Sequence, residues 1–325
     1  MYEFLRDNYV EDDDHMFRFD YSREFLKWHL TAPGYLKQWH AAIVREDKKQ
    51  MVGFISAIPV HIVALGKEVM KVEINFLCVK TELRAKRLAA VLIKEITRRV
   101  HWQNIWQAVY TAGVLLPKPI ATCTYYHRNL NIKKLLDVKF TYLSPHLNIT
   151  RAKSVYKIAK DTTIQGLRKM EEKDVEGVFK ILNEYLCKFK VRPFYTIDEV
   201  AHWFLPRDKV VYSYVVENSN NEITDFISFY SLPSSILNHD VHKTLWAAYS
   251  FFNVANSVTL KELMKNALTL ACNEKFDVFN ALNIMDNEGV FTDLLFGQGD
   301  GSLRYYFYNY ACPEIKPNEL GIVLM

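Results

Sequence analysis

The sequence predicts an α/β fold, more broadly α+β, in which two similar halves pack side by side and a mixed sheet is flanked by helices. Half of the 325 residues are apolar, which is enough to bury the cores of two domains or of two fused halves. Strand-like runs rich in aromatic and β-branched residues alternate with amphipathic helices. Three antiparallel strands, a helix and a further strand recur in pattern, although the residues differ.

The first half is expected to begin its sheet near residue 40. Its strands are predicted at 40–44, 51–65, 69–79 and 106–113, with a helix at 84–101. The helix rests on Leu88, Leu92, Ile96 and Val100, which recur every four residues. A loop marked by Pro117, Pro119 and the polar "YYHRNLN" (125–131) then leads to a short helix at 131–137 and a strand at 139–143.

The second half repeats this order. Strands are predicted at 209–218, 222–233, 244–254 and 276–282, and a helix at 259–273 between the last two. That helix begins with a capping box of Thr259 and Glu262. Residues 144–170 are polar and poorly periodic, so the boundary is placed there, which divides the chain into residues 1–160 and 161–325.

Composition excludes several classes of protein. No stretch approaches the roughly 20 uncharged apolar residues of a membrane helix, and the acidic start "MYEFLRDNYVEDDD" is unlike a secretory signal. Five scattered cysteines without a CxxC pair suit reduced thiols, so a cytoplasmic location is expected. The net charge of +4 is too small to support nucleic-acid binding. His239 and His242 lack a third ligand, so no metal is expected.

The chain ends on the apolar run "LGIVLM", residues 320–325, where most proteins place polar, exposed residues. Composition alone favours an edge strand for this run. It attaches the α-carboxylate of Met325 to a segment that is expected to be buried.

Residues 73–89, "EINFLCVKTELRAKRLA", join a strand to a helix through a short basic loop. The free amides at a helix N-terminus, with Arg84, Lys86 and Arg87 nearby, suit a pyrophosphate, although basic residues there are more often a solvated face. Acyltransferases that use coenzyme A place a bulged strand before such a helix, where unpaired amides polarise the thioester carbonyl.

This stretch resembles the signature E-I-N-F-L-C-V-H-K of the glycylpeptide N-tetradecanoyltransferases, also called N-myristoyltransferases. Glu73 to Val79 match, and Lys80 and Thr81 depart from it. "LFGQGDG" resembles the second signature, K-F-G-x-G-D-G, with Leu295 in place of Lys. "NYVEDDDHMFRFDYS", "VGFISAIP", "TAGVLLPKP", "FISFYSLPS" and "FDVFNAL" extend the resemblance over essentially the whole chain.

The resemblance implies two fused halves of the GNAT acyltransferase type related by a pseudo-twofold axis. Residues 1–160 would bind acyl-CoA and residues 161–325 the peptide. The implied reaction moves a myristoyl group from myristoyl-CoA, the co-substrate, to an N-terminal glycine amine. A monomer is expected, with no stable membrane insertion. Members usually carry an upstream Thr-Gln-Pro-Val segment that helps to cover coenzyme A, and residues 1–325 begin after it. Either the chain is a fragment, or its acyl-CoA site is incompletely built.

The resemblance assigns the chemistry to the main chain. The amides of Phe76 and Leu77 would hold the oxyanion, and the carboxylate of Met325 would be the base. Burial raises the pKa of such a carboxylate toward that of the amine. Asn75 and Thr111 would hold the glycine amine, although local backbone capping explains them about as well. The acyl-CoA site would also include Cys78, Val79, Arg84, Ala85, Lys86, Arg87, Leu88 and Ala89.

The peptide site implied by the resemblance combines acidic and aromatic side chains. Asp12, Asp14 and Asp300 would face a basic residue downstream of the glycine. The other residues are Val10, Phe17, Phe19, Tyr21, Tyr110, Tyr125, His127, Ser250 and Gly301. Two other functions remain open: an acetyl-CoA-dependent N-acetyltransferase of the same fold superfamily, and a non-catalytic acyl-CoA or peptide-binding remnant.

Overall fold

The computed structural model describes residues 1–144 and 146–325, and Pro145 of the expected linker lies outside the described residues. Strands and helices, with η for a 3₁₀ helix, follow one another in the first part as α1 (Tyr2–Asn8), β1 (Phe17–Phe19), α2 (Arg23–Leu30), η1 (Lys37–Trp39), β2 (His40–Arg45), β3 (Gln50–Ala64), β4 (Lys67–Val79), η2 (Thr81–Lys86), α3 (Leu88–His101), β5 (Ala108–Ala112), β6 (Ala121–Asn129) and α4 (Ile132–Asp137).

The remaining elements begin after the undescribed residue. They are α5 (Ile149–Val155), β7 (Leu167–Lys169), η3 (Glu172–Asp174), α6 (Val175–Leu186), β8 (Val191–Pro193), α7 (Ile197–Phe204), β9 (Val211–Glu217), β10 (Ile223–Ser231), β11 (Ser234–Ile236), β12 (Thr244–Leu245), β13 (Ala247–Val254), α8 (Leu260–Asn273), β14 (Val278–Leu282), α9 (Glu288–Phe291), β15 (Gly297–Tyr308) and η4 (Pro317–Glu319).

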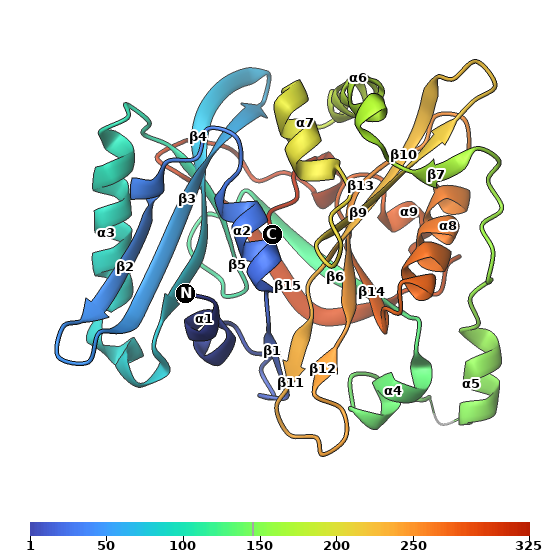
Figure 1. The fold of residues 1–325 in the computed structure, drawn as a ribbon, viewed down its shortest axis with the longest axis horizontal. Helices are drawn as coiled ribbons and strands as arrows, with labels where there is room; N and C mark the ends of the chain where they lie inside the picture. Colours follow the sequence, from blue (N-terminus) through green and yellow to red (C-terminus); the bar gives the residue numbers. More distant parts are fainter. Residues whose placement is uncertain (145) are drawn as a thin grey trace.

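A twelve-stranded mixed sheet runs across the molecule in the order β2-β3-β4-β5-β15-β6-β14-β13-β10-β9-β7, and β8 pairs with β3 (Figure 1). The predicted repeat is confirmed as β2-β3-β4-α3-β5 and β9-β10-β13-α8-β14. In both copies the last pair is parallel, with Val72 opposite Ala108 and Ala247 opposite Val278. At the centre the halves exchange strands, because β15 pairs with β5 and β6 pairs with β14. This arrangement confirms the predicted α/β class.

In the described part of the chain, helices pack against the sheet through three clusters of buried apolar residues. In Figure 1, α3 covers the sheet at one end of the molecule, while α8 and α9 lie toward the other end. The cluster under α3 includes Leu92, Ile96 and Val100, three of the four residues that predicted the helix. The largest cluster joins α2, α6 and α7 to the end of the chain. The site described below lies in this largest cluster.

Four predictions differ from the structure. The loop predicted over 125–131 is mostly strand, because β6 extends to Asn129 and pairs with β14 and β15. The helix predicted from Arg84 begins at Leu88, because a 3₁₀ segment precedes it and Arg87 has a φ of 57°. The strand predicted at 139–143 is absent, because the amides of Phe140 and Thr141 fold back to the carbonyl of Leu135 at the end of α4. Residues 321–325 form no strand. Only Leu320 makes a single bridge, to Val191, so the tail is buried without joining a ladder.

Two further predictions need adjustment. The strand predicted at 244–254 is interrupted at Trp246, whose amide donates to the carboxylate of Asp277 and not to a neighbouring strand. The polar segment after residue 144 contains the short helix α5, which the side chain of Asn148 caps. Within the described part of the chain, no helix is both long and apolar enough to cross a membrane.

Candidate active site

A β-bulge interrupts β4 within the residues of the first signature. Phe54 of β3 lies opposite Cys78, and Ser56 lies opposite Asn75, so two residues of β4 face one residue of β3. Phe76, in the bulge, has a φ of 55°, an uncommon backbone conformation for an aromatic residue. Its side chain is fully buried, and its amide donates to Oδ1 of Asn75 at 2.8 Å. The bulge therefore turns backbone amides out of the ladder where the sequence predicts an oxyanion site.

The C-terminal tail reaches the same place from the other side of the chain. Ile322, Val323 and Leu324 are buried, and the terminal carboxylate of Met325 accepts a hydrogen bond from Nδ2 of Asn75. The amide of Gly321 donates to the carbonyl of Val191 at 2.8 Å and anchors the tail. The structure thus brings together Met325, Asn75 and the bulge, which lie 250 positions apart in the sequence.

Position 321 requires a glycine because the tail passes directly over an aromatic ring. A Cβ atom there would lie 2.7 Å from Cδ2 of Phe189 and 2.9 Å from its Cβ and Cγ. Such distances are shorter than van der Waals contact, so any side chain would displace the tail or the ring. The absence of a side chain at residue 321 therefore helps to set the depth at which the carboxylate lies.

The polar surroundings of Asn75 come from β4 itself and from α2. Nδ2 of Asn75 lies 3.4 Å from Oε1 of Glu73, and this oxygen lies 3.2 Å from Nε2 of His29. Glu73 and His29 are both buried. Thr111 of β5 lies two residues beyond Val109, the register partner of Glu73. Thr111 itself pairs with Tyr305 of β15.

The residues assigned to acyl-CoA line the path from the bulge to α3. Cys78 and Val79 are buried at the end of β4, while Ala85, Lys86 and Arg87 are exposed in the turn. Burial raises the pKa of the Cys78 thiol to about 11, so this group remains a neutral thiol. Arg87 precedes α3 without a side-chain cap, and Leu88 and Ala89 begin the helix. The first amides of α3 therefore lack a side-chain acceptor, as an anion site requires.

Arg84 is not directed at such an anion in this structure. Its Nη2 donates to the carbonyl of Asn8 at 2.7 Å, at the end of α1. The guanidinium thus ties α1 to the turn that follows β4. Lys86 and Arg87 remain exposed beside the start of α3.

One carboxylate of the acidic loop before β1 is used in hydrogen bonds within the loop's own turn. Oδ1 of Asp12 accepts the amides of Met16 at 2.8 Å and Phe17 at 2.6 Å. Asp14 is exposed, and the carbonyl of Val10 accepts the amide of Phe19 at 3.0 Å. Asp14 is therefore more available to an external cation than Asp12 is.

An aromatic row connects β1 to β6. The rings of Phe17 and His127 both pack edge-on against Phe140, with ring centroids 5.7 and 5.4 Å away. Nδ1 of His127 lies 2.7 Å from Oδ1 of Asn280, and burial lowers the pKa of its imidazole. Tyr125 lies in the same strand, with its ring centroid 6.5 Å from that of His127. The sequence-predicted Phe17, Tyr125 and His127 are thus gathered on one wall.

Other predicted peptide residues border this wall. Tyr21 is buried edge-on against Phe76, at 5.1 Å between ring centroids. Phe19 contacts the ring of Tyr21 at 6.2 Å. Ser250 is buried in β13, where its hydroxyl accepts a hydrogen bond from Asn253. Tyr110 is not brought into this group, because its ring stacks on Tyr306 at 5.2 Å.

The "GDG" loop forms a wide irregularity in β15. Residues 299–301 all lie opposite Tyr125, between the pairs Gln298 with Tyr126 and Ser302 with Thr124. A Cβ at Gly299 would lie 2.3 Å from Nε2 of His127, so only glycine fits this close approach. Asp300 and Gly301 are exposed at the rim. The charge of Asp300 favours the protonated form of His127 and so opposes the lowering of its pKa by burial.

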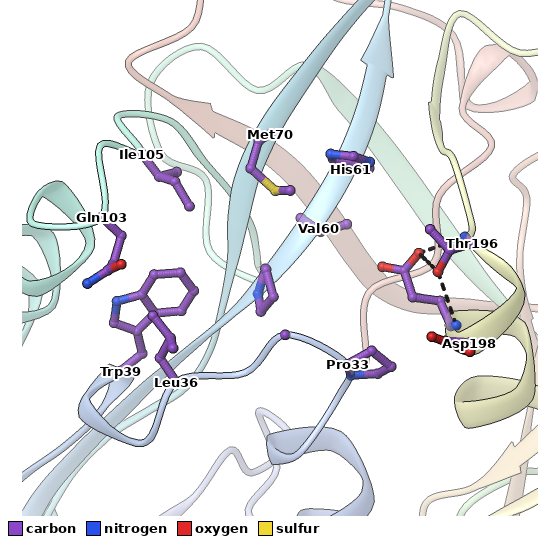
Figure 2. Close-up of a pocket in the computed structure, with 13 residues that line it drawn as sticks. Pro33, Leu36, Trp39, Val60, His61, Met70, Gln103, Ile105, Thr196 and Asp198 are labelled. Atoms are coloured by element: carbon purple, nitrogen blue, oxygen red, sulfur yellow. Dashed lines mark hydrogen bonds between the residues drawn. The ribbon is translucent and has the colours of Figure 1, made fainter.

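A cavity lies beside these residues and not among them. It has a volume of about 440 Å³ and lies between the loop before β2, the hairpin of β3 and β4, and the start of α7 (Figure 2). Pro33, Trp39, Met70 and Ile105 form apolar walls. A second cavity of about 30 Å³ shares Val60 and His61 with it and reaches Glu73 and Met325. The base candidate thus borders a space large enough for a water molecule.

Metal ligands are not clustered in the described residues, where no group of three or more His, Cys, Asp or Glu side chains is arranged to hold an ion. Nε2 of His239 and Nε2 of His242 lie 3.7 and 3.2 Å from the Asp137 carboxylate.

Sequence reasoning missed two residues of the polar network, Glu73 and His29. Both had a signal. Glu73 is a carboxylate in an otherwise apolar strand, and His29 lies four residues after Phe25 on the apolar face of α2. It also missed Val191 and Phe189, whose role depends on where the tail lies.

Comparisons with known proteins agree with this geometry. The family model described as "Myristoyl-CoA:protein N-myristoyltransferase, N-terminal domain" matches residues 1–123, and that of the C-terminal domain matches residues 137–323. The glycylpeptide N-tetradecanoyltransferase of Plasmodium falciparum is 51% identical over all of this chain and 79% of its own length. The probable enzyme of Caenorhabditis elegans is 50% identical over all of this chain and 72% of its own length.

Solved structures are similar over the whole chain. The N-myristoyltransferase of Saccharomyces cerevisiae, solved with bound myristoyl-CoA, has a TM-score of 0.96 and 40% identity, and the match covers all of this chain and 81% of that one. A GCN5-related N-acetyltransferase of Anabaena variabilis shares the fold alone, with a TM-score of 0.50 and 12% identity over 94% of this chain and 68% of its own. The chain belongs to the myristoyl-CoA:protein N-myristoyltransferase family.

Proposed function

We propose that this protein transfers the myristoyl group of myristoyl-CoA to the N-terminal glycine amine of protein substrates. The observation that carries the proposal is the terminal carboxylate of Met325, held by Asn75 beside the β4 bulge. A base and a set of turned-out amides are therefore close together on two otherwise unrelated parts of the chain. Family membership supports the same reaction.

The bulge supplies the oxyanion donors and the tail supplies the base. The glycine nitrogen forms a bond to the thioester carbon, and the carbon–sulfur bond then breaks. The carboxylate of Met325 takes the proton that the amine nitrogen loses and passes it to the departing coenzyme A sulfur, which leaves as the thiol. The amides of Phe76 and Leu77 stabilise the oxyanion, for which Phe76 exchanges its hydrogen bond to Asn75 for one to substrate. Removing one such donor typically costs about 3 to 4 kcal/mol of transition-state stabilisation.

Asn75 and Thr111 position the amine, and the exposed acidic residues select the peptide. Asp14 and Asp300 face outward near the aromatic wall and are available to a basic residue a few positions after the glycine. Lys86, Arg87 and the free amides of α3 receive the phosphates of coenzyme A. Residues 1–160 would hold the acyl-CoA, and the peptide would contact both the aromatic wall and the exposed Asp300 and Gly301 of residues 161–325. We place the reaction in the cytoplasm because all five cysteines are free thiols, and we propose that the enzyme acts as a monomer.

The direct test is incubation with tetradecanoyl-CoA and an octapeptide that begins with Gly, followed by mass spectrometry. Addition of one tetradecanoyl group is the expected result, and the same peptide beginning with Ala should not react. Transfer from acetyl-CoA but not from tetradecanoyl-CoA would instead support the acetyltransferase. Binding of both ligands without transfer would support the non-catalytic alternative.

A further inference from the structure

A buried carboxylate lies directly behind the terminal one. Glu73 is two residues before Asn75 on β4 and is only 7% exposed. It pairs with Ile58 of β3 and Val109 of β5, so neither neighbouring strand offers it a charged partner. Its one cationic or donor neighbour besides Asn75, among the described residues, is His29 of α2 at 3.2 Å.

Asn75 joins this carboxylate to the terminus. Its Nδ2 lies 3.4 Å from Oε1 of Glu73 and donates to the carboxylate of Met325. Two acceptors of one amide nitrogen are no more than about 7 Å apart. Glu73 and Met325 also line the same cavity of about 30 Å³. The two carboxylates are therefore neighbours in a site with little room for water.

The surroundings of His29 direct its imidazole to Glu73. The imidazole is fully buried, with Phe25 stacked on it and the rings of Phe76 and Trp203 edge-on at 5.1 and 5.7 Å. Nδ1 has no hydrogen-bond partner in the part of the chain that the structure describes. Its polar contacts, with Glu73 and with Nδ2 of Asn75 at 3.4 Å, are therefore made through Nε2, and the tautomer with a proton on Nε2 donates to the Glu73 carboxylate.

We propose that Glu73, which is in contact with His29, is a positioning residue that strengthens the Met325 carboxylate as a base. The inference rests on the proposed function, because it assigns a role relative to that base. Like charges that share one donor in a poorly hydrated site raise each other's affinity for a proton. A terminal carboxylate is intrinsically a weak base, so a nearby anion brings it closer to the amine that it must deprotonate.

The other titratable groups around the pair do not replace this charge at neutral pH. Burial raises the pKa of Tyr21, Tyr195 and Tyr305 well above its ordinary value, so these phenols are neutral. Burial lowers the pKa of His202 to about 4 and also lowers that of His40. Glu199 and His61 line the shared cavity. Glu199 is engaged in the helix cap with Thr196, and His61 lies 3.7 Å from Glu68, so both are directed to other partners.

The test compares single-turnover rate constants from pH 5 to 9, with saturating tetradecanoyl-CoA and an N-terminal-glycine peptide. In Glu73→Gln the acidic limb should move down by about one pH unit, and the rate at pH 7.5 should fall about threefold to tenfold. His29→Ala should shift the limb in the same direction. His29→Gln, which keeps an N–H donor, should recover most of the parent profile. Thermal unfolding and tetradecanoyl-CoA binding establish that each variant is folded.

The outcomes separate the two proposals. If the parent transfers no acyl group, the proposed function and this inference both fall. If the parent is active and the folded variants keep its pH profile, only the inference is overturned. In that case Glu73 and His29 merely satisfy each other in the core, and their loss lowers stability without altering the base.

Discussion

Deleting Met325 is the sharpest perturbation that the structure suggests. The deletion moves the α-carboxylate back to Leu324, and one extended residue spans about 3.3 to 3.6 Å. That displacement exceeds the tolerance of a hydrogen bond to Nδ2 of Asn75. The tail cannot slide forward to compensate, because the amide of Gly321 is anchored to Val191 and its backbone lies against Phe189.

The expected loss follows from the role of the group. A positioned general base contributes about 10² to 10⁴ in rate, so turnover should fall by at least about 10². The side chain of Met325 is only partly buried and the buried residues before it are retained, so folding and acyl-CoA binding should change little. The loss should therefore appear in the rate constant of transfer and not in the affinity for tetradecanoyl-CoA.

The assay is single-turnover transfer to a Gly peptide, with tetradecanoyl-CoA affinity and thermal unfolding measured on the same samples. Met325→Ala is the matched control, because it removes the side chain and keeps the carboxylate in place. Its turnover should remain within a few-fold of the parent. A deletion variant that also transfers within a few-fold of the parent would refute the assignment of the terminal carboxylate as the base.

Three further changes test other parts of the structure. Gly321→Ala places a methyl group against Phe189 and should lower turnover about tenfold to hundredfold by displacing the tail, with acyl-CoA affinity unchanged; an unchanged rate would show that the tail adapts. Lys71 is fully buried, and burial lowers the pKa of its amine from 10.5 to about 8, so the unfolded chain binds more protons between these values. The free energy of unfolding should consequently rise by about 2 kcal/mol from pH 8 to 9.5, and Lys71→Met should abolish this rise in urea titrations; identical pH dependence in both proteins would contradict the reasoning. Asp14→Asn should raise KM by up to about fivefold for peptides with a Lys a few residues after the glycine. Asp13→Asn is the control for KM, and acyl-CoA affinity should be the same in both variants. Equal effects of the two variants on KM would argue against a specific contact.

Local patterns predicted the elements of the repeat, but not α1, α2, β6, α6 or α7. The periodicities of two and 3.6 residues identified the repeated order of strands and helix, because they record which face of each segment is buried. They failed where distant contacts decide the local structure. Arg84 bonds back to the end of α1 and the turn before α3 becomes 3₁₀, and residues 140 and 141 cap α4 in place of a strand.

The candidate site was accessible to sequence only in part. The first signature located the bulge residues, and the apolar ending drew attention to Met325. No sequence pattern shows that β6 and β15 are exchanged between the halves, or that His29 of α2 lies against Glu73. Such pairs depend on the path of the whole chain, so their chemistry becomes visible only when the elements are packed.

The terminal run illustrates this division. The sequence by itself determined that the last residues are apolar, and hence that the final carboxylate is attached to a buried segment. The sequence suggested a strand, because a short apolar run at a chain end has the local pattern of an edge strand. Only the tertiary structure decided that the tail stays outside the ladder, anchored at Gly321 and directed at Asn75. Apolar composition is enough to predict that a segment is buried. The partner of a buried carboxylate, however, is set by the packing of segments that are remote in sequence.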